Sequence, residues 1–220
     1  MLNAATPAPR GSQAATQGFS LIELLVGITI LAIALGMGAP AFADWIRNAR
    51  VRSTAEALQD GLYFARSEAA RRNAIVRFQL TSTLDNGCAL NADGPDWVVS
   101  QSVKDSPAGQ CAAAVDDATA PYLLKKSPEV SSNSHATVAA NRSLLAFDGL
   151  GRLNSLGDTT DITAFVVDVT SSDGTCVADG GRVQCLRVIV QPAGQISMCD
   201  PAPTHTSSDD PLTCPEIAEN

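Results

Sequence analysis

The chain has 220 residues, a formal net charge of −8 and a hydrophobic fraction of 45%. This length is enough for one globular domain with its own core in addition to a long helix. The acidic balance excludes a surface that attracts nucleic acid or anionic lipid through its overall charge.

Residues 1–18 are predicted to form a disordered leader on the cytoplasmic side of a membrane. The stretch is small and polar, has no periodicity, and contains a single charged side chain, Arg10. Cytoplasmic flanks of membrane helices tend to be positive, so Arg10 agrees with this assignment.

An apolar run from Phe19 to Ala43 follows the leader, and Glu23 is its only charged residue. A run of about 20 to 25 apolar residues is long enough to span a bilayer as a helix. The small residue that resembles a cleavage site, Gly18, precedes this run, whereas a secretory signal is cleaved after a shorter one. Cleavage after Gly18 would therefore remove only the leader and leave the helix on the mature protein.

Glu23 is a candidate functional residue because an acidic side chain in a membrane helix costs a few kcal/mol. Either it reaches the headgroups from near the helix end, or it forms an ion pair with another chain. Cleavage after Gly18 would create a cationic amino group at Phe19, at the membrane depth of a neighbour's Glu23. Such a pair would set the register of adjacent helices.

The segment Gly18-Phe19-Ser20-Leu21-Ile22-Glu23 and the apolar helix after it resemble the processing signature of the type IV pilin family. The resemblance implies that prepilin peptidase cleaves between Gly18 and Phe19 and methylates the new amine. It also implies that Glu23 is the assembly glutamate and Pro40 the helix-bending proline of many pilins. The chain is thus expected to cross the inner membrane once, with a periplasmic C-terminal domain, before it enters a pilus.

Helical spacing resumes after Pro40, where the proline and nearby glycines weaken the helix, and continues to Asn73. An apolar stripe at three- and four-residue steps should face a core, and it consists of Val51, Ala55, Leu58, Leu62, Ala65 and Ala69. Glu68 and Arg72 are spaced to pair on the exposed face. Arginines at positions 47, 50, 52, 66, 71 and 72 make this segment basic, as either a solvated face or a DNA-binding stripe.

Short β-type runs separated by turn residues begin after Ala74. Strands are predicted at residues 76–80, 97–100, 122–125, 144–147, 162–169, 182–190 and 195–198. The expected fold class is α+β, with a long N-terminal helix packed on an antiparallel β-sheet or sandwich. The expected division is a leader (1–18), a helix (19–73) with a membrane half (19–43) and an amphipathic half (44–73), and a β-rich domain with an acidic tail (74–220).

The even number of cysteines in the exported part predicts disulfides, and these are Cys88, Cys111, Cys176, Cys185, Cys199 and Cys214. Gly180-Gly181 suits a two-residue hairpin turn, which would place Cys176 opposite Cys185 with α-carbons about 4.5 Å apart. Cys88–Cys111 and Cys199–Cys214 would then follow by elimination, among about 15 possible connectivities.

Within the pilin family, the segment 62–69 (LYFARSEA) is similar to the helix signature of minor pilins of the FimT and FimU kind. The minor pseudopilin H of type II secretion shares this signature, and segments 147–152 and 185–199 also resemble the group. The resemblance implies a low-abundance subunit that primes pilus assembly and joins tip subunits to the major pilin. Its partners would be other minor pilins and the major pilin, and a type II secretion pseudopilin is the alternative.

A DNA-binding pilus receptor is an alternative of another class, because some FimT-type members bind DNA through a late Gly-Arg-x-Arg motif. The matching segment here is Gly194-Gln195-Ile196-Ser197, which has neither arginine. This departure and the acidic balance disfavour DNA as a partner.

The sequence contains no catalytic constellation, phosphate loop or metal-binding motif, so an enzyme, a cofactor and a metal are not expected. Its two histidines, His135 and His205, lack partners at metal-ligand spacing. Four acidic loop residues are either calcium ligands or solvated turn residues, namely Asp158, Asp161, Asp173 and Asp179.

Overall fold

The computed structural model describes residues 19–101, 106–128, 136–155, 163–202, 204, 207, 209–215 and 217. The leader, Gly18 and both histidines lie outside these residues. The chain divides into two compact units, Met1–Phe42 and Ala43–Asn220. Helix α1 (Leu21–Arg72) begins in the first unit and ends in the second, so its amphipathic half belongs to the same unit as the strands.

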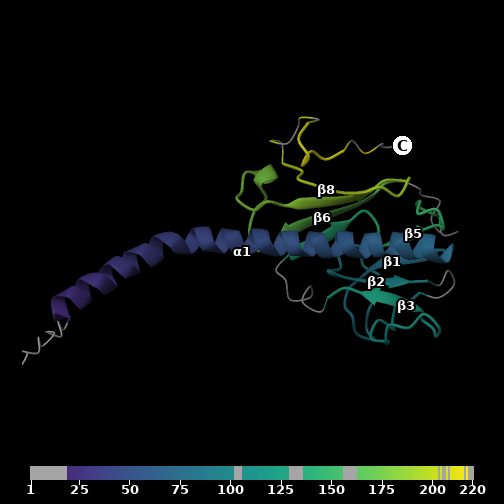
Figure 1. Cartoon of the computed structure of the whole chain (residues 1–220), viewed down its shortest axis with the longest axis horizontal. Coiled ribbons are helices and arrows are strands. Elements are labelled where there is room, and N and C mark those ends of the chain that lie inside the picture. The colour runs from purple at the N-terminus through teal and green to yellow at the C-terminus, as the bar shows by residue number, and fades with distance from the viewer. Residues whose placement is uncertain are drawn as a thin grey trace, which may run out of the picture. The chain divides into compact units, whose positions relative to one another are not determined.

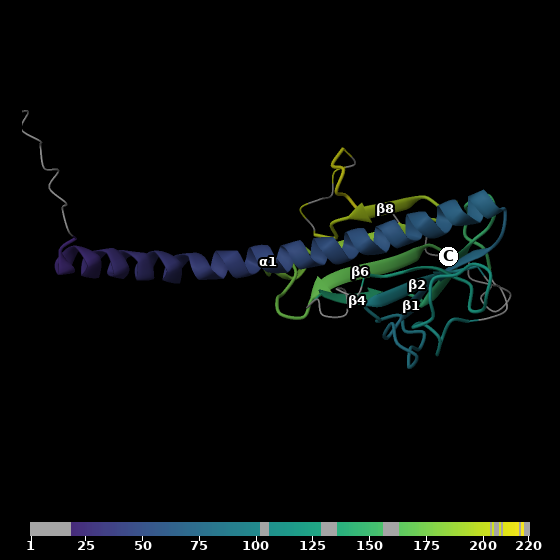
Figure 2. The same cartoon turned by 60° about the horizontal axis from the view of Figure 1, so that its bottom comes forward.

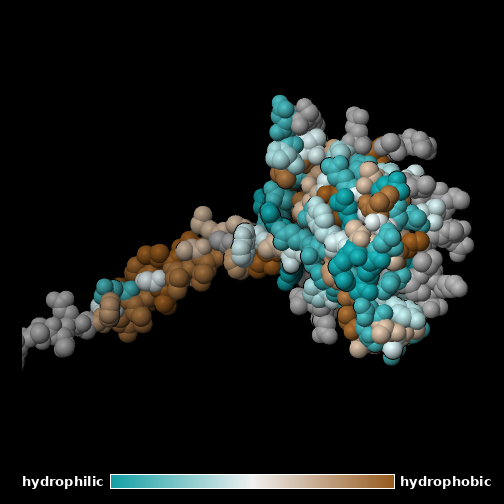
Figure 3. Space-filling model, turned by 45° about the vertical axis from the view of Figure 1, so that its right-hand side comes forward, coloured by the Kyte–Doolittle hydropathy of each residue, from teal (hydrophilic) through white to brown (hydrophobic). Residues whose placement is uncertain are grey.

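The apolar half of α1 exposes its large side chains. Nearly every bulky residue of this half is about half exposed or more, including Leu21, Ile22, Leu24, Ile30, Ile33 and Met37. In Figure 3 the surface of this helical segment is mostly brown, the colour of hydrophobic residues. No single described helix meets the length and composition expected of a membrane span, but Leu21–Met37 and Ala41–Arg72 meet them together as a bent pair.

Two four-stranded antiparallel sheets pack against the second half of α1, as Figures 1 and 2 show. The first sheet has the order β3-β2-β1-β5, with β3 (Leu123–Lys126), β2 (Asp96–Ser100), β1 (Val76–Thr81) and β5 (Leu144–Phe147). The second has the order β4-β6-β7-β8, with β4 (Ala136–Ala140), β6 (Phe165–Ser171), β7 (Leu186–Val190) and β8 (Ile196–Cys199). The predicted α+β class is confirmed.

The core lies between α1 and both sheets. The predicted apolar stripe is buried, because all six of its residues are at most 1% exposed. Phe78 of β1 stacks on Trp97 of β2 with ring centroids 5.4 Å apart and meets Phe165 of β6 edge-on at 6.5 Å, so aromatic contacts join the two sheets. Gly61 lets the helix approach this cluster, since a Cβ there would lie 2.8 Å from the Trp97 ring.

Helix α1 ends where the sequence predicted. Asn73 has a left-handed φ of 48°. Its N–H donates to the carbonyl of Ala70 at 3.4 Å, and the N–H of Ala74 donates to that of Ala69 at 3.2 Å. This pair of bonds is a Schellman motif, which satisfies carbonyls that the last helical turn leaves open.

Disulfides join Cys88 to Cys111, Cys176 to Cys185 and Cys199 to Cys214, the pairs that the sequence favoured. The predicted two-residue hairpin around Gly180-Gly181 is wrong. Residues Val177–Asp179 instead form a 3₁₀ helix, η2, which Gly180 closes with a φ of 81°. The α-carbons of Cys176 and Cys185 are therefore 5.5 Å apart, farther than a hairpin pair would place them.

Three strand predictions also differ from the structure. The strand expected over 162–169 begins only at Phe165 and extends to Ser171. The strand expected over 182–190 begins only at Leu186, because Val183 forms a parallel bridge with Cys176. Strand β4 was not predicted, since its sequence ATVAA is rich in alanine, which is a weak strand former. Pairing with β6 along its whole length holds this segment in the sheet.

Candidate assembly site

The candidate assembly residues lie at the start of α1. Phe19, the first described residue, is 86% exposed. Glu23 is the acidic residue of the first helical turn and is exposed. No ion pair joins Glu23 to any residue in the described part of the chain.

Pro40 lies within α1, and the helix continues on both sides of it. The two helical segments of the bent pair, Leu21–Met37 and Ala41–Arg72, meet across residues 38–40. Proline removes one backbone hydrogen bond from a helix interior, and this loss accounts for a bend at this place.

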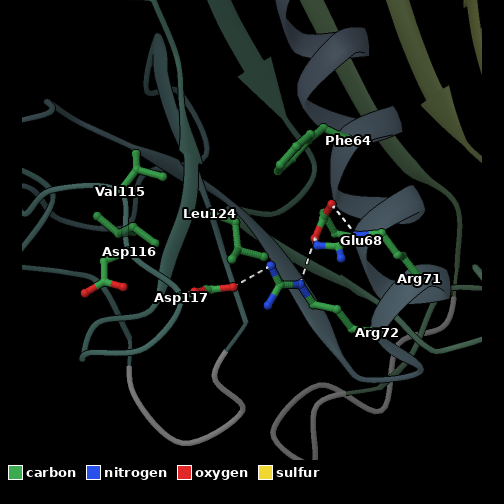
Figure 4. Close-up of a pocket in the computed structure, with 9 residues that line it drawn as sticks. Phe64, Glu68, Arg71, Arg72, Val115, Asp116, Asp117 and Leu124 are labelled. Atoms are coloured by element: carbon green, nitrogen blue, oxygen red, sulfur yellow. Dashed lines mark hydrogen bonds and ion pairs between the residues drawn. The ribbon is translucent and has the colours of Figure 1, made fainter.

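At the other end of α1, a pocket of about 360 Å³ opens between the helix and the loop before β3. Arg72 lies at its centre in Figure 4, between Glu68 of the helix and Asp117 of the loop. Its Nε donates to Glu68 at 2.7 Å, and one Nη donates to Asp117 at 2.9 Å. Glu68 also accepts a 2.6 Å bond from Arg71. The predicted Glu68–Arg72 pair thus exists, but the Glu68 side chain is only 13% exposed and does not lie on an open face.

This network predicts an acid-sensitive contribution to stability. The hydrogen bond from Arg71 lowers the pKa of Glu68 below 4.5, although partial burial opposes the shift. Because the folded-state pKa is depressed, the contribution is present above about pH 4.5 and is lost as the pH falls through the folded pKa. Glu68→Gln should remove it, so the variant's urea midpoint should fall less than that of the wild type between neutral and acidic pH. Glu56→Gln, which removes a charge from the exposed pair with Arg52, controls for net charge.

Three segments that carry the narrower pilin resemblance meet on one side of α1. Arg66 Nε donates to the carbonyl of Gly151 at 3.2 Å, and the Tyr63 hydroxyl donates to that of Ile196 at 3.0 Å. Gly194 packs directly against Gly151. The sequence predicted turn residues between the strands but gave no signal that these two loops would contact the same helical turn.

The basic helix face predicted from the sequence is partly neutralised. Arg47 pairs with Asp44 at 2.8 Å, and Arg52 pairs with Glu56 at 2.8 Å. Among the described residues there is no group of three or more potential metal ligands, so Asp173 and Asp179 belong to no such cluster. Asp158, Asp161, His135 and His205 lie outside the described residues.

The chain is similar to known protein families in sequence and to known proteins in structure. Residues 54–194 match the model of a family described as type II transport protein GspH, and residues 14–39 match the prokaryotic N-terminal methylation motif. No curated protein sequence matches the chain. Two crystal structures of the Pseudomonas aeruginosa type IV minor pilin FimU are similar to it. The first is 19% identical with a TM-score of 0.43, covering 67% of this chain and 87% of that one. The second is 18% identical with a TM-score of 0.40, covering 67% and 90%.

Proposed function

The chain belongs to the GspH family of type II transport proteins, and from this premise we propose that it is a minor pilin that primes type IV pilus assembly and links tip subunits to the major pilin. The observation that carries the proposal is the methylation motif over residues 14–39, which contains Gly18, Phe19 and Glu23. Prepilin peptidase would cleave and methylate at Gly18–Phe19.

The exposed helix supports this role. A soluble monomer rarely exposes a continuous apolar surface as long as that of Leu21–Met37. Lipid of the inner membrane would cover this surface before assembly, with the β-rich domain in the periplasm. Helices of other minor pilins and of the major pilin would cover it in the filament.

Glu23 would fix the axial alignment of neighbouring helices in the filament. In the low dielectric between apolar helices, a carboxylate is stable only when it is paired and hydrogen-bonded. The amino group that cleavage creates at Phe19 is a cation at the same depth in a neighbouring subunit. Because an axial slip would separate the two charges, the pair favours one alignment of adjacent helices.

A minor pseudopilin of type II secretion is the second candidate, favoured by the description of the matching family. Both roles use the same helix and the same glutamate. Deletion of the chain separates them, since loss of pili supports the first role and loss of secreted enzymes with normal pili supports the second.

Glu23→Ala tests the shared basis of both roles. We expect export and leader removal to stay normal, while the amount of the subunit in sheared filaments falls roughly tenfold or more, because an unpaired buried amine costs several kcal/mol. Immunoblots of membrane and filament fractions measure both quantities. Glu56→Ala removes an exposed carboxylate from the same helix and should behave as wild type. Normal incorporation of Glu23→Ala would refute the assigned role.

A further inference from the structure

Trp45 is the large aromatic side chain that follows the apolar run most closely. It lies two residues after Ala43 and is 64% exposed, whereas the only other tryptophan, Trp97, is 1% exposed. Two residues of chain span at most about 7 Å, so Trp45 stays close to the end of the run. Tryptophan is enriched at membrane interfaces, where its apolar ring and its N–H meet both environments.

The spacing between Trp45 and the cleavage site matches the thickness of a bilayer. The 26 residue steps from Phe19 to Trp45 correspond to about 39 Å of α-helix. A bilayer with its headgroup layers is about 40–45 Å thick. A helical segment of this length is therefore long enough to reach from a Trp45 in one headgroup layer to the opposite surface.

The surface around Trp45 is amphipathic and fixed in place. A groove of about 380 Å³ beside it is lined by residues of α1, the start of β7 and the tail, including Ala49, Leu186 and Leu212. The Cys199–Cys214 disulfide and a 2.9 Å bond from Asp200 N–H to the Leu212 carbonyl hold the tail there. We call Trp45, Ala49, Leu186 and Leu212 the Trp45 surface.

Several charged residues around the Trp45 surface form ion pairs. Asp44 pairs with Arg47 at 2.8 Å and with Arg182 at 3.6 Å. Arg52 pairs with Glu56 at 2.8 Å. Because Asp44 is shared by two arginines, these five groups carry one positive charge in excess. A small positive excess beside an exposed tryptophan suits the headgroup layer of a membrane.

We propose that the Trp45 surface docks in the periplasmic headgroup layer before assembly and sets the depth of α1. At that depth the Gly18–Phe19 bond is presented to the peptidase on the cytoplasmic side. This inference rests on the proposed function, because it requires that the apolar half of α1 be retained in the membrane. The occupant of the Trp45 surface is lipid, and the surface leaves the membrane when the subunit enters a filament.

Depth-dependent quenching tests the docking. The full-length precursor is placed in phosphatidylcholine vesicles whose lipids carry bromine either near the headgroup or deep in the acyl chains. Because Trp97 is buried, quenching reports on Trp45. We expect the strongest quenching from the shallow bromines. Fluorescence unaffected by either bromine position would overturn the proposal, and so would quenching by the deep bromines alone.

Flotation of the same vesicles separates this inference from the proposed function. Protein that fails to float with lipid contradicts membrane retention itself. Protein that floats but shows unquenched Trp45 contradicts only the docking. Protection of Trp45 in filaments, without quenching in vesicles, would assign the surface to the helix of a neighbouring subunit instead.

The rate of leader removal tests whether this docking presents the Gly18–Phe19 bond to the peptidase. In membranes supplied with prepilin peptidase, Trp45→Ala should be cleaved severalfold more slowly than the wild type, and Trp45→Tyr should restore much of the rate. Tyr63→Ala, which removes another exposed aromatic side chain from α1, is the matched control and should be cleaved normally. Cleavage of Trp45→Ala at the wild-type rate would show that Trp45 does not set the depth.

Discussion

Trp97→Ala is expected to lower the free energy of unfolding of the β-rich unit by about 3–5 kcal/mol. The indole is 1% exposed and fills the space between Gly61 of α1 and Phe78 of β1. Its removal deletes the stacked pair and leaves a cavity that helix and sheet cannot close without moving. Since a domain of this size is stable by only about 5–15 kcal/mol, much of its stability would be lost.

Pulse proteolysis of the full-length chain in detergent and a urea series measures this loss without relying on tryptophan fluorescence. Trp45→Ala is the matched control, because the same substitution at an exposed position leaves no cavity. A urea midpoint for Trp97→Ala equal to that of Trp45→Ala would show that the Phe78–Trp97 contact does not hold the helix to the sheet.

The sequence predicted the elements that depend on local pattern. The stripe from Val51 to Ala69 repeats at three- and four-residue steps, and only one face of a helix can bury it, so its burial followed directly. Glu23 and Phe19 belong to one contiguous motif, and that motif alone was enough to locate them.

Features that depend on contacts distant in sequence were missed. Asp117 carries no motif and joins the Glu68–Arg72 pair only because its loop folds against the end of α1. Gly180-Gly181 has the composition of a tight hairpin turn, but Gly181 packs against the carbonyl of Thr175, and a 3₁₀ helix forms in place of the hairpin. In both cases the local sequence is compatible with several conformations, and tertiary packing selects one.

Gly194 is another position where tertiary packing, and not the local sequence alone, determines the conformation. It has a φ of 85°, a conformation that disfavours any side chain, and a Cβ there would overlap the carbonyl oxygen of Gly151. The same Gly151 carbonyl accepts the bond from Arg66, so displacing it would also disturb the contact with α1. The strain of a left-handed alanine costs about 1–2 kcal/mol, and overpacking adds about 1–3 kcal/mol.

Gly194→Ala should therefore destabilise the fold by about 2–5 kcal/mol in the same urea series. Gly180→Ala separates the two contributions, because Gly180 has a nearly identical φ of 81° and no atom within 4 Å of the place that a Cβ would occupy. That variant should lose only the conformational part, about 1–2 kcal/mol. If the two variants lose equal stability, the packing of Gly194 on Gly151 contributes nothing, and the glycine is needed only for its backbone conformation. A larger loss at Gly194 would show that the β7–β8 turn, the loop after β5 and the helical turn at Arg66 are stabilised together.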